Sequence, residues 1–140
     1  SDGGFYDVAK YSKYPFVASH SNAREVCTHK RNLTDDMIKI LSNKGGITGI
    51  NFCKAFLNTT PRGNIEDMIN HITHIYKVGG IDVIALGTDF DGIISDGLEI
   101  DNIGDIQKLA HGLKKANFNE EQIEKIFYKN ALRVIKETMK

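Results

Sequence analysis

Three short apolar runs, each ending in polar residues, constrain the fold of this chain more than any other feature. The runs cover Phe16–Ser19, Ile47–Phe52 and Val83–Leu86. His20 follows the first run directly, and the carboxylates Asp89 and Asp91 follow the third, just before Gly92. Continuous apolar runs of this length are typical of buried strands in a parallel sheet. Because catalytic groups in barrels of parallel strands lie at the carboxyl ends of the strands, we expect acid–base chemistry there.

Amphipathic segments separate and follow the runs, with capping residues at several starts and glycines at several ends. The helices expected from these signals cover residues 5–12, 34–44, 64–78, 103–115, 119 onward and 129–139. The alternation predicts an α/β fold with a parallel sheet covered by helices. Right-handed crossovers place sequential strands side by side, so the strands should pair in chain order. Three strands cannot close a barrel of eight, so residues 1–140 are predicted to form a single partial domain of a larger α/β protein.

Composition narrows the function classes. The chain has 18 basic and 18 acidic side chains, so its charge favours neither nucleic acid nor an anionic membrane. No apolar run approaches the roughly 18 residues that span a bilayer, and the start of the chain lacks the pattern of a signal peptide. Cys27 and Cys53 are isolated and lack metal-binding spacing. We therefore expect reduced thiols and a cytoplasmic protein.

The polar residues at the ends of the runs are the candidates for chemistry. His20 can bind a metal or exchange a proton, or it can simply be hydrogen-bonded in a loop. Asp89 and Asp91 can provide a general base, although Asp before Gly is also a common turn signal. Asn51, at the end of the second run, is a weaker candidate for the same pocket.

Arg31 and a pair of histidines are further candidates. Arg31, in a basic stretch beyond the first run, can clamp a carboxylate through two hydrogen bonds, or it can belong to a solvated basic cluster. His71 and His74 have a spacing that can bind metal on a helix, but they fall in a segment expected to be an outer layer. We therefore expect both histidines at the surface, away from the strand ends.

Five segments occur in an order and spacing that are together specific. They are Ala18-Ser19-His20-Ser21-Asn22-Ala23-Arg24, Arg31-Asn32, Gly49-Ile50-Asn51-Phe52, Gly87-Thr88-Asp89-Phe90-Asp91-Gly92 and Asn130-Ala131-Leu132-Arg133-Val134. As a set they resemble the membrane (renal) dipeptidase family, peptidase family M19. The resemblance implies a metal-dependent TIM (β/α)8 barrel related to the amidohydrolases, of which this chain is the C-terminal portion, about strands 6–8 with their helices. It also implies a metallodipeptidase with two zinc ions that hydrolyses dipeptides.

The resemblance assigns roles residue by residue. His20 matches the zinc-ligand histidine at the tip of the sixth strand. Arg31 matches the arginine that grips the carboxylate of the substrate. Asp89 matches the aspartate after the eighth strand, which handles the proton during hydrolysis. Asn51 and Asp91 match motif positions to which the resemblance gives no role.

The resemblance also implies that the other metal groups lie before this chain begins. They are an HxD pair, a bridging glutamate and a histidine after the fifth strand, and a further substrate-binding histidine also lies upstream. Because catalytic zinc needs about three protein ligands, the site is expected to be incomplete and the isolated chain inactive. Open strand edges and apolar faces should then pair with the missing N-terminal half of the barrel or drive self-association.

Two alternatives stay open at this point. The chain could be a non-catalytic α/β fragment with a structural or binding role, or it could catalyse another amidohydrolase-type reaction, such as deamination or lactone hydrolysis. Arg31 favours a substrate with a free carboxylate, which suits a dipeptide better than a nucleobase.

Overall fold

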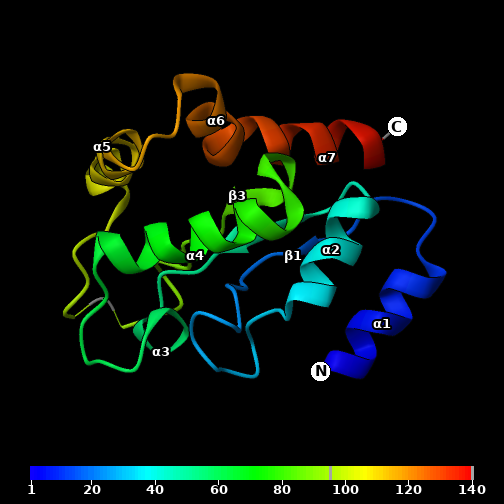
Figure 1. The fold of residues 1–140 in the computed structure, drawn as a ribbon, viewed down its shortest axis with the longest axis horizontal. Helices are drawn as coiled ribbons and strands as arrows, with labels where there is room; N and C mark the ends of the chain where they lie inside the picture. The colour runs from blue at the N-terminus through cyan, green and yellow to red at the C-terminus, as the bar shows by residue number, and fades with distance from the viewer. Residues whose placement is uncertain (95, 140) are drawn as a thin grey trace.

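Helices and strands alternate along the chain in this computed structural model, which describes residues 1–94 and 96–139 (Figure 1). The elements are α1 (Asp2–Tyr11), β1 (Val17–Ala18), α2 (Asp35–Asn43), β2 (Ile47–Ile50), α3 (Lys54–Leu57), α4 (Ile65–Gly79), the 3-10 helix η1 (Ile81–Val83), β3 (Ile84–Leu86), the 3-10 helix η2 (Ile103–Asp105), α5 (Gln107–Lys115), α6 (Glu120–Glu124), the π-helical turn η3 (Lys125–Lys129) and α7 (Asn130–Thr138). Among the described residues, no helix has the length and apolar character needed to cross a bilayer.

The three strands form one parallel sheet in the order β1-β2-β3, which confirms the predicted pairing. Val17 pairs with Ile47, and Thr48 pairs with Ile84. The strands are shorter than predicted, and Val83 lies in η1 instead of the third strand. Beyond the carboxyl ends of the strands, main-chain bonds such as Gly87 N–H to the carbonyl of Ile50 continue, and the side chain of Asn22 also binds the main chain of Asn51.

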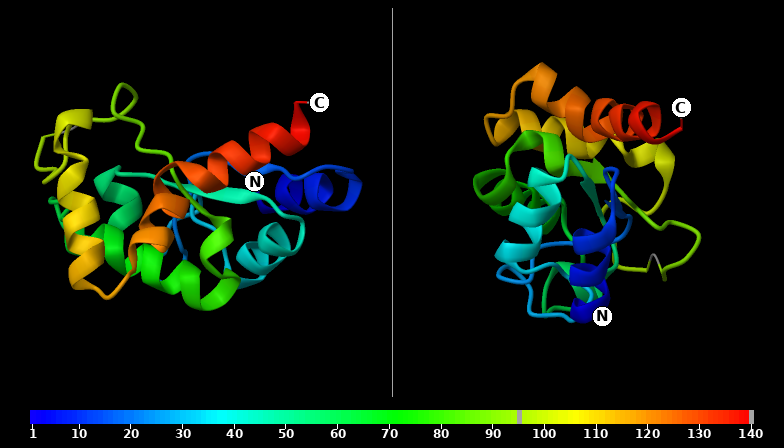
Figure 2. Two further views of the ribbon diagram at one scale, coloured as in Figure 1. Left: turned by 90° about the horizontal axis from the view of Figure 1, so that it is seen from above. Right: turned by 90° about the vertical axis from the view of Figure 1, so that its right-hand side faces the viewer.

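Helices cover both faces of the sheet. On one face, Ile50 and Ile84 are fully buried in a core that includes Ile38 of α2 and Ile72 of α4. On the other face, β2 and β3 pack against Val134 of α7 in a smaller apolar cluster. The helices α5, α6 and α7 line one side of the molecule, α4 runs through the middle, and α1 lies on the opposite side (Figure 2).

The C-terminal helix fixes the amino ends of the strands. The Asn130 amide donates to the carbonyls of Ile81 and Ile84, both at 2.8 Å. The Arg133 guanidinium donates to the carbonyls of Gly45 at 2.7 Å and Asp82 at 2.9 Å. Helix α6 continues through the turn η3 into α7, so two segments that the sequence treats separately form one helical stretch.

Two glycines let the strands converge at their carboxyl ends. A Cβ on Gly49 would clash with the carbonyl oxygen of Ser19 and lie 2.9 Å from the Cα of Gly87. A Cβ on Gly87 would clash with the same oxygen. The three strand ends therefore approach more closely than any side chain allows, and this brings the residues that follow them together.

His71 corrects a prediction. The sequence predicts this imidazole at the surface, but His71 lies on α4 with its side chain fully buried. Its Nδ1 accepts the main-chain N–H of Ala23 at 3.1 Å, so the proton of the neutral ring is on Nε2, which donates to the carbonyl of Leu57 at 2.9 Å. Burial lowers the pKa of His71, although its bond to Leu57 acts in the opposite direction. His74 does lie partly exposed, with Nε2 2.7 Å from Asp35.

We predict that His71 makes stability depend on pH. The pKa of His71 is lowered in the folded state from an ordinary value of 6.5, so below about pH 6.5 the unfolded chain binds a proton that the folded chain excludes. The contribution of His71 to the free energy of unfolding is complete above pH 6.5. Below pH 6.5 this contribution falls by up to about 1.4 kcal/mol for each pH unit. Urea titrations between pH 7.5 and 5.5 should show a smaller loss for His71→Asn than for the wild type.

The matched control is His111→Asn, because His111 is exposed on α5. This variant should keep the full loss of stability on acidification. If His71→Asn lost as much stability as the wild type over the same interval, the buried imidazole would not be the source of the pH dependence.

Candidate active site

The residues that follow the three strands meet at one edge of the sheet. His20 follows β1, Asn51 follows β2 and Asp89 follows β3. The Nε2 atom of His20 lies 3.8 Å from Oδ1 of Asp89. The Asn51 amide donates to the other carboxylate oxygen, Oδ2, at 3.2 Å. The prediction that His20, Asn51 and Asp89 share one edge is therefore confirmed.

His20 is oriented by its neighbour. Its Nδ1 atom shares a hydrogen bond of 2.7 Å with the hydroxyl of Ser19, so Nε2 is the nitrogen that faces Asp89. The side chain of His20 is 37% exposed. An imidazole nitrogen held in this way suits either metal binding or proton exchange.

Asp89 combines a turn with a site position. Its backbone is left-handed, with φ of 65°, a conformation that Asp tolerates better than most residues. The N–H of Gly92 donates to the carbonyl of Asp89 at 2.9 Å, and a Cβ on Gly92 would clash with the Asp89 carboxylate. The Asp-Phe-Asp-Gly stretch is thus a turn that presents Asp89 to the site. Asp91 is exposed and forms no hydrogen bond or ion pair within the described residues.

Arg31 lies in the same cavity as Asp89. A cavity of about 780 Å³ is lined by both residues, together with Cys53, Phe56 and Ile93. The guanidinium carbon of Arg31 is 5.4 Å from the ring centre of Phe56. In residues 1–94 and 96–139 no carboxylate forms an ion pair with Arg31. The geometry leaves this guanidinium available to a ligand that carries a carboxylate.

Sequence reasoning missed three buried polar residues beneath the site. Asn22, Asn32 and His71 are all fully buried. Asn32 donates to the carbonyls of Cys27 and Phe56, both at 2.9 Å, and its Oδ1 accepts the N–H of Asn22 at 3.2 Å. No local pattern marks these residues, because their partners are distant in sequence. Asn22 and Asn32 do fall in the Ala18–Arg24 and Arg31-Asn32 segments, whereas His71 lies in none of the five segments.

The described residues do not offer a complete set of donors for a metal ion. The described residues contain no group of three or more His, Cys, Asp or Glu side chains that could hold a metal ion. His20 can offer one nitrogen, and the neighbouring carboxylate of Asp89 is already bound by Asn51. The residues present therefore fit one ligand position of a catalytic zinc and do not form a zinc site by themselves.

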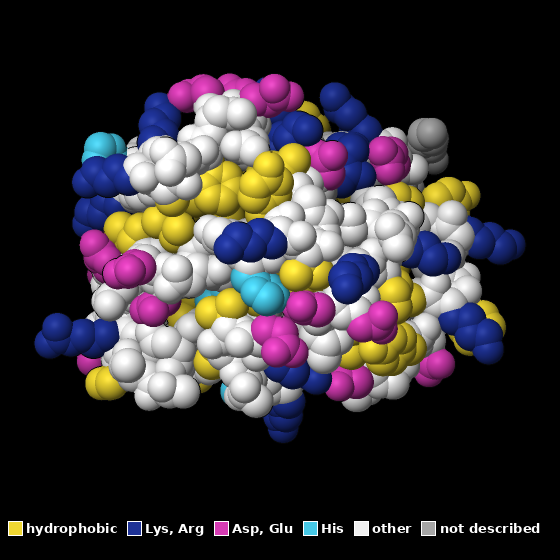
Figure 3. Space-filling model, in the orientation of Figure 1, with side chains coloured by type: hydrophobic (Ala, Val, Ile, Leu, Met, Phe, Trp, Pro, Cys, Tyr) yellow, Lys and Arg dark blue, Asp and Glu magenta, His cyan; other side chains and the backbone are white. Residues whose placement is uncertain are grey.

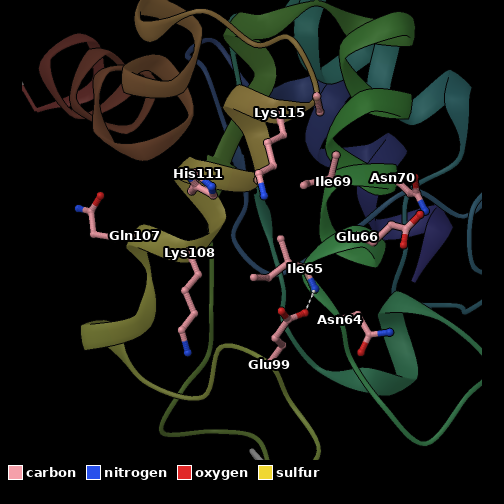
Figure 4. A pocket seen from close by; sticks show the side chains of 12 residues that line it. Asn64, Ile65, Glu66, Ile69, Asn70, Glu99, Gln107, Lys108, His111 and Lys115 are labelled. Carbon is pink, nitrogen blue, oxygen red and sulfur yellow. Dashed lines mark hydrogen bonds between the residues drawn. The ribbon is translucent and has the colours of Figure 1, made fainter.

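A larger groove lies away from the strand ends. Apolar side chains gather along the gap between α4 and the α5–α6 segment (Figure 3). A groove of about 1060 Å³ there is lined by Ile65, Ile69, Lys108 and Lys115, and at one end of it the Glu99 carboxylate accepts the N–H of Ile65 at 2.9 Å (Figure 4). None of the residues predicted for the site lines this groove. The smaller cavity at the strand ends is therefore the one that carries the candidate chemistry.

Comparisons with known proteins agree with this arrangement. A family model described as membrane dipeptidase (peptidase family M19) matches residues 1–140. An uncharacterized dipeptidase of Schizosaccharomyces pombe is 35% identical over 136 residues, which cover 95% of this chain and 33% of that protein. Dipeptidase ataJ of Aspergillus terreus is 32% identical over 133 residues, covering 94% and 32%. The chain spans between 32% and 51% of the length of these and a further curated relative.

Solved structures share the fold. A metallo peptidase from Rhodobacter sphaeroides, bound to a phosphinate mimic of the dipeptide L-Ala-D-Ala, matches with a TM-score of 0.88 and 31% identity, covering 96% of this chain and 39% of its own. The dipeptidase AC, an M19 metallo peptidase, matches with a TM-score of 0.88 and 30% identity over 96% and 41%. The model that describes the family matches every residue of this α/β chain. The chain therefore belongs to the membrane dipeptidase family, peptidase family M19.

Proposed function

We propose that the protein that carries this chain is a metallodipeptidase, and that this chain supplies the proton-handling and carboxylate-binding side of its site. The observation that carries the proposal is the meeting of His20, Asn51 and Asp89 at one edge of the sheet, with Arg31 in the same cavity. Relatives named dipeptidases and a structure bound to a dipeptide mimic support a dipeptide as the substrate.

Arg31 is proposed to hold the carboxylate of the dipeptide. Its guanidinium lies near the Phe56 ring, which limits its freedom while leaving its N–H groups free to bind two carboxylate oxygens. Ile93 and Ile94 add an apolar wall to the same cavity, where the substrate's side chain can lie. An arginine in this position favours a substrate with a free carboxylate, which suits a dipeptide better than a nucleobase.

Asp89 is proposed to accept the proton of the attacking water and then deliver it to the amine that leaves. A carboxylate at the rim of the cavity is a suitable acceptor because it is partly exposed and already fixed in position. When zinc is bound, it supplies Lewis-acid chemistry that makes water more acidic and polarises the peptide carbonyl. His20 would provide one of the zinc ligands, and the others would come from the part of the protein outside this chain.

The barrel itself is also a proposal. The matches to the M19 structures include 96% of this chain but only about two fifths of each of those structures. Its sheet has three strands, and Val17 on the outer strand β1 is 49% exposed. We propose that further strands pair with both outer strands to complete an eight-stranded barrel, in which these are about strands 6–8, and that the isolated chain is inactive. The cytoplasmic location stays a prediction.

The first prediction from the proposed function concerns Asp89. Asp89→Asn keeps the shape of the side chain but removes the proton acceptor, so kcat of the full protein should fall by roughly 10²–10⁴-fold. Zinc content should change little, because His20 remains. Steady-state kinetics on a dipeptide and metal analysis would measure both. Asp91→Asn is the control, two residues away and exposed, and it should keep normal turnover. Near-normal turnover of Asp89→Asn would return this stretch to a simple turn.

The second prediction concerns Arg31. Arg31→Lys keeps the charge but loses the paired hydrogen bonds to a carboxylate, so KM should rise about 10- to 100-fold with little change in kcat. Arg62→Lys, at another exposed arginine, serves as the control and should leave both constants unchanged. An unchanged KM for Arg31→Lys would show that the substrate's carboxylate binds elsewhere.

The third prediction concerns His20. His20→Ala removes an imidazole ligand, so the protein should retain less zinc after dialysis than the wild type, and activity should fall in parallel. His111→Ala, at an exposed position on α5, should retain wild-type zinc. Elemental analysis of dialysed protein measures the difference, and equal zinc in His20→Ala and wild type would rule out His20 as a ligand.

A further inference from the structure

Asn51 exchanges no proton in the proposed reaction, yet it is fully buried and donates a hydrogen bond directly to Asp89. We propose that Asn51 is a positioning residue, which holds Oδ2 of Asp89 and leaves Oδ1 as the oxygen that exchanges the proton. This inference rests on the proposed function of Asp89 and adds the residue that selects which carboxylate oxygen acts.

The hydrogen bonds of Asn51 fix the direction of its amide. Its Oδ1 atom lies 2.7 Å from the main-chain nitrogen of Cys53. A main-chain N–H can only donate, so the atom facing it must be the oxygen. The NH₂ group is therefore the one that faces Asp89, at 3.2 Å from Oδ2. Asn51 is an obligatory donor to Asp89, and a flipped amide would lose both hydrogen bonds.

The main chain of Asn51 is held in place by the side chain of Asn22. Its main-chain N–H donates to Oδ1 of Asn22 at 2.8 Å, and its carbonyl accepts from the amide of Asn22 at 2.9 Å. Asn22 is in turn bound through its N–H to Asn32, the neighbour of Arg31. Since Asn22, Asn32 and Asn51 are all fully buried, the network has little freedom to rearrange. The position of the Asn51 amide is thus preset before any substrate arrives.

The two oxygens of Asp89 are consequently different. Oδ2 is occupied by the N–H of Asn51, whereas Oδ1 faces Nε2 of His20 across 3.8 Å, and the side chain as a whole is 30% exposed. In the proposed reaction, the attacking water loses its proton to Oδ1 as its oxygen bonds to the peptide carbon. The same proton passes from Oδ1 to the amine nitrogen as the C–N bond breaks, so Asp89 ends in its starting state. A carboxylate free to rotate would present either oxygen and would be correctly placed for less of the time.

The test compares two variants of Asn51 in the full protein that carries this chain. Asn51→Asp is nearly isosteric and keeps an oxygen for the Cys53 N–H, but it replaces the donor to Asp89 with an acceptor. Asn51→Ala removes the donor without adding charge, and it serves if the first variant folds poorly. We expect kcat to fall about 10- to 100-fold in both, with KM changed less than threefold, because substrate binding through Arg31 is left intact.

A double-mutant cycle with Asp89→Asn separates positioning from general damage. If Asn51 acts through Asp89, adding Asn51→Asp or Asn51→Ala to Asp89→Asn should lower kcat by less than threefold further. A purely structural role would give the same fold loss in both backgrounds. Thermal unfolding of each variant checks that the losses of kcat are measured on folded protein.

Asn102→Asp is the matched control, because Asn102 has the same pair of hydrogen bonds as Asn51. Its amide oxygen accepts the main-chain N–H of Gly104, two residues later, at 2.8 Å, and its NH₂ group donates to the Asp105 carboxylate at 3.3 Å. It should keep wild-type kcat and KM. Wild-type kcat in Asn51→Asp or in a folded Asn51→Ala, or multiplicative losses in the cycle, would overturn the role of Asn51 while leaving that of Asp89 intact. Near-normal turnover of Asp89→Asn would instead overturn the proposed function.

Discussion

The exchange of hydrogen bonds between Asn22 and Asn51 is the interaction on which the polar edge of this structure depends. The side chain of Asn22 offers Asn51 one donor and one acceptor, as a neighbouring strand would. It thereby continues the pairing of β1 and β2 beyond the last residues of both strands. Both residues are fully buried, and a buried main-chain group without a partner costs about 1–3 kcal/mol. The chain can therefore end its strands early without losing main-chain hydrogen bonds.

The two ends of the sheet are secured in the same way for different purposes. At the amino ends, the side chains of Asn130 and Arg133 of α7 donate to main-chain carbonyls and attach the helix to the sheet. At the carboxyl ends, buried asparagines bind the main chain and leave His20 and Asp89 partly exposed. An apolar core lies between them. This division lets the reactive groups remain accessible while the main chain beneath them is fixed.

The same asparagines connect the two halves of the proposed chemistry. Asn22 and Asn32 both donate to the carbonyl of Phe56, whose ring lies against Arg31. Asn22 also holds Asn51, which holds Asp89. Arg31, proposed to bind the substrate, and Asp89, proposed to exchange its proton, are thus positioned by the same buried network of asparagines. Fixed geometry of this kind is what allows a substrate to be bound and attacked without further rearrangement.

The sequence predicts the strand order and the meeting of His20, Asn51 and Asp89, because parallel crossovers leave few ways to arrange three strands. It does not predict the roles of Asn22 or His71, because their partners lie 29 and 48 residues away and leave no local signal. For the same reason His71 was expected at the surface, since helical spacing alone does not show which loops cover a helix. The close approach at Gly49 and Gly87 also depends on strands brought together only in the fold.

The most direct test of the account is a crystal structure of the full protein with a phosphinate dipeptide mimic. The account predicts that the carboxylate of the mimic lies roughly 3 Å from the guanidinium nitrogens of Arg31, as in a charge-assisted hydrogen bond. It also predicts that a phosphinate oxygen faces Oδ1 of Asp89 while Asn51 stays bound to Oδ2. A mimic bound with Arg31 turned away, or with Asp89 released from Asn51 and pointing out of the cavity, would contradict it.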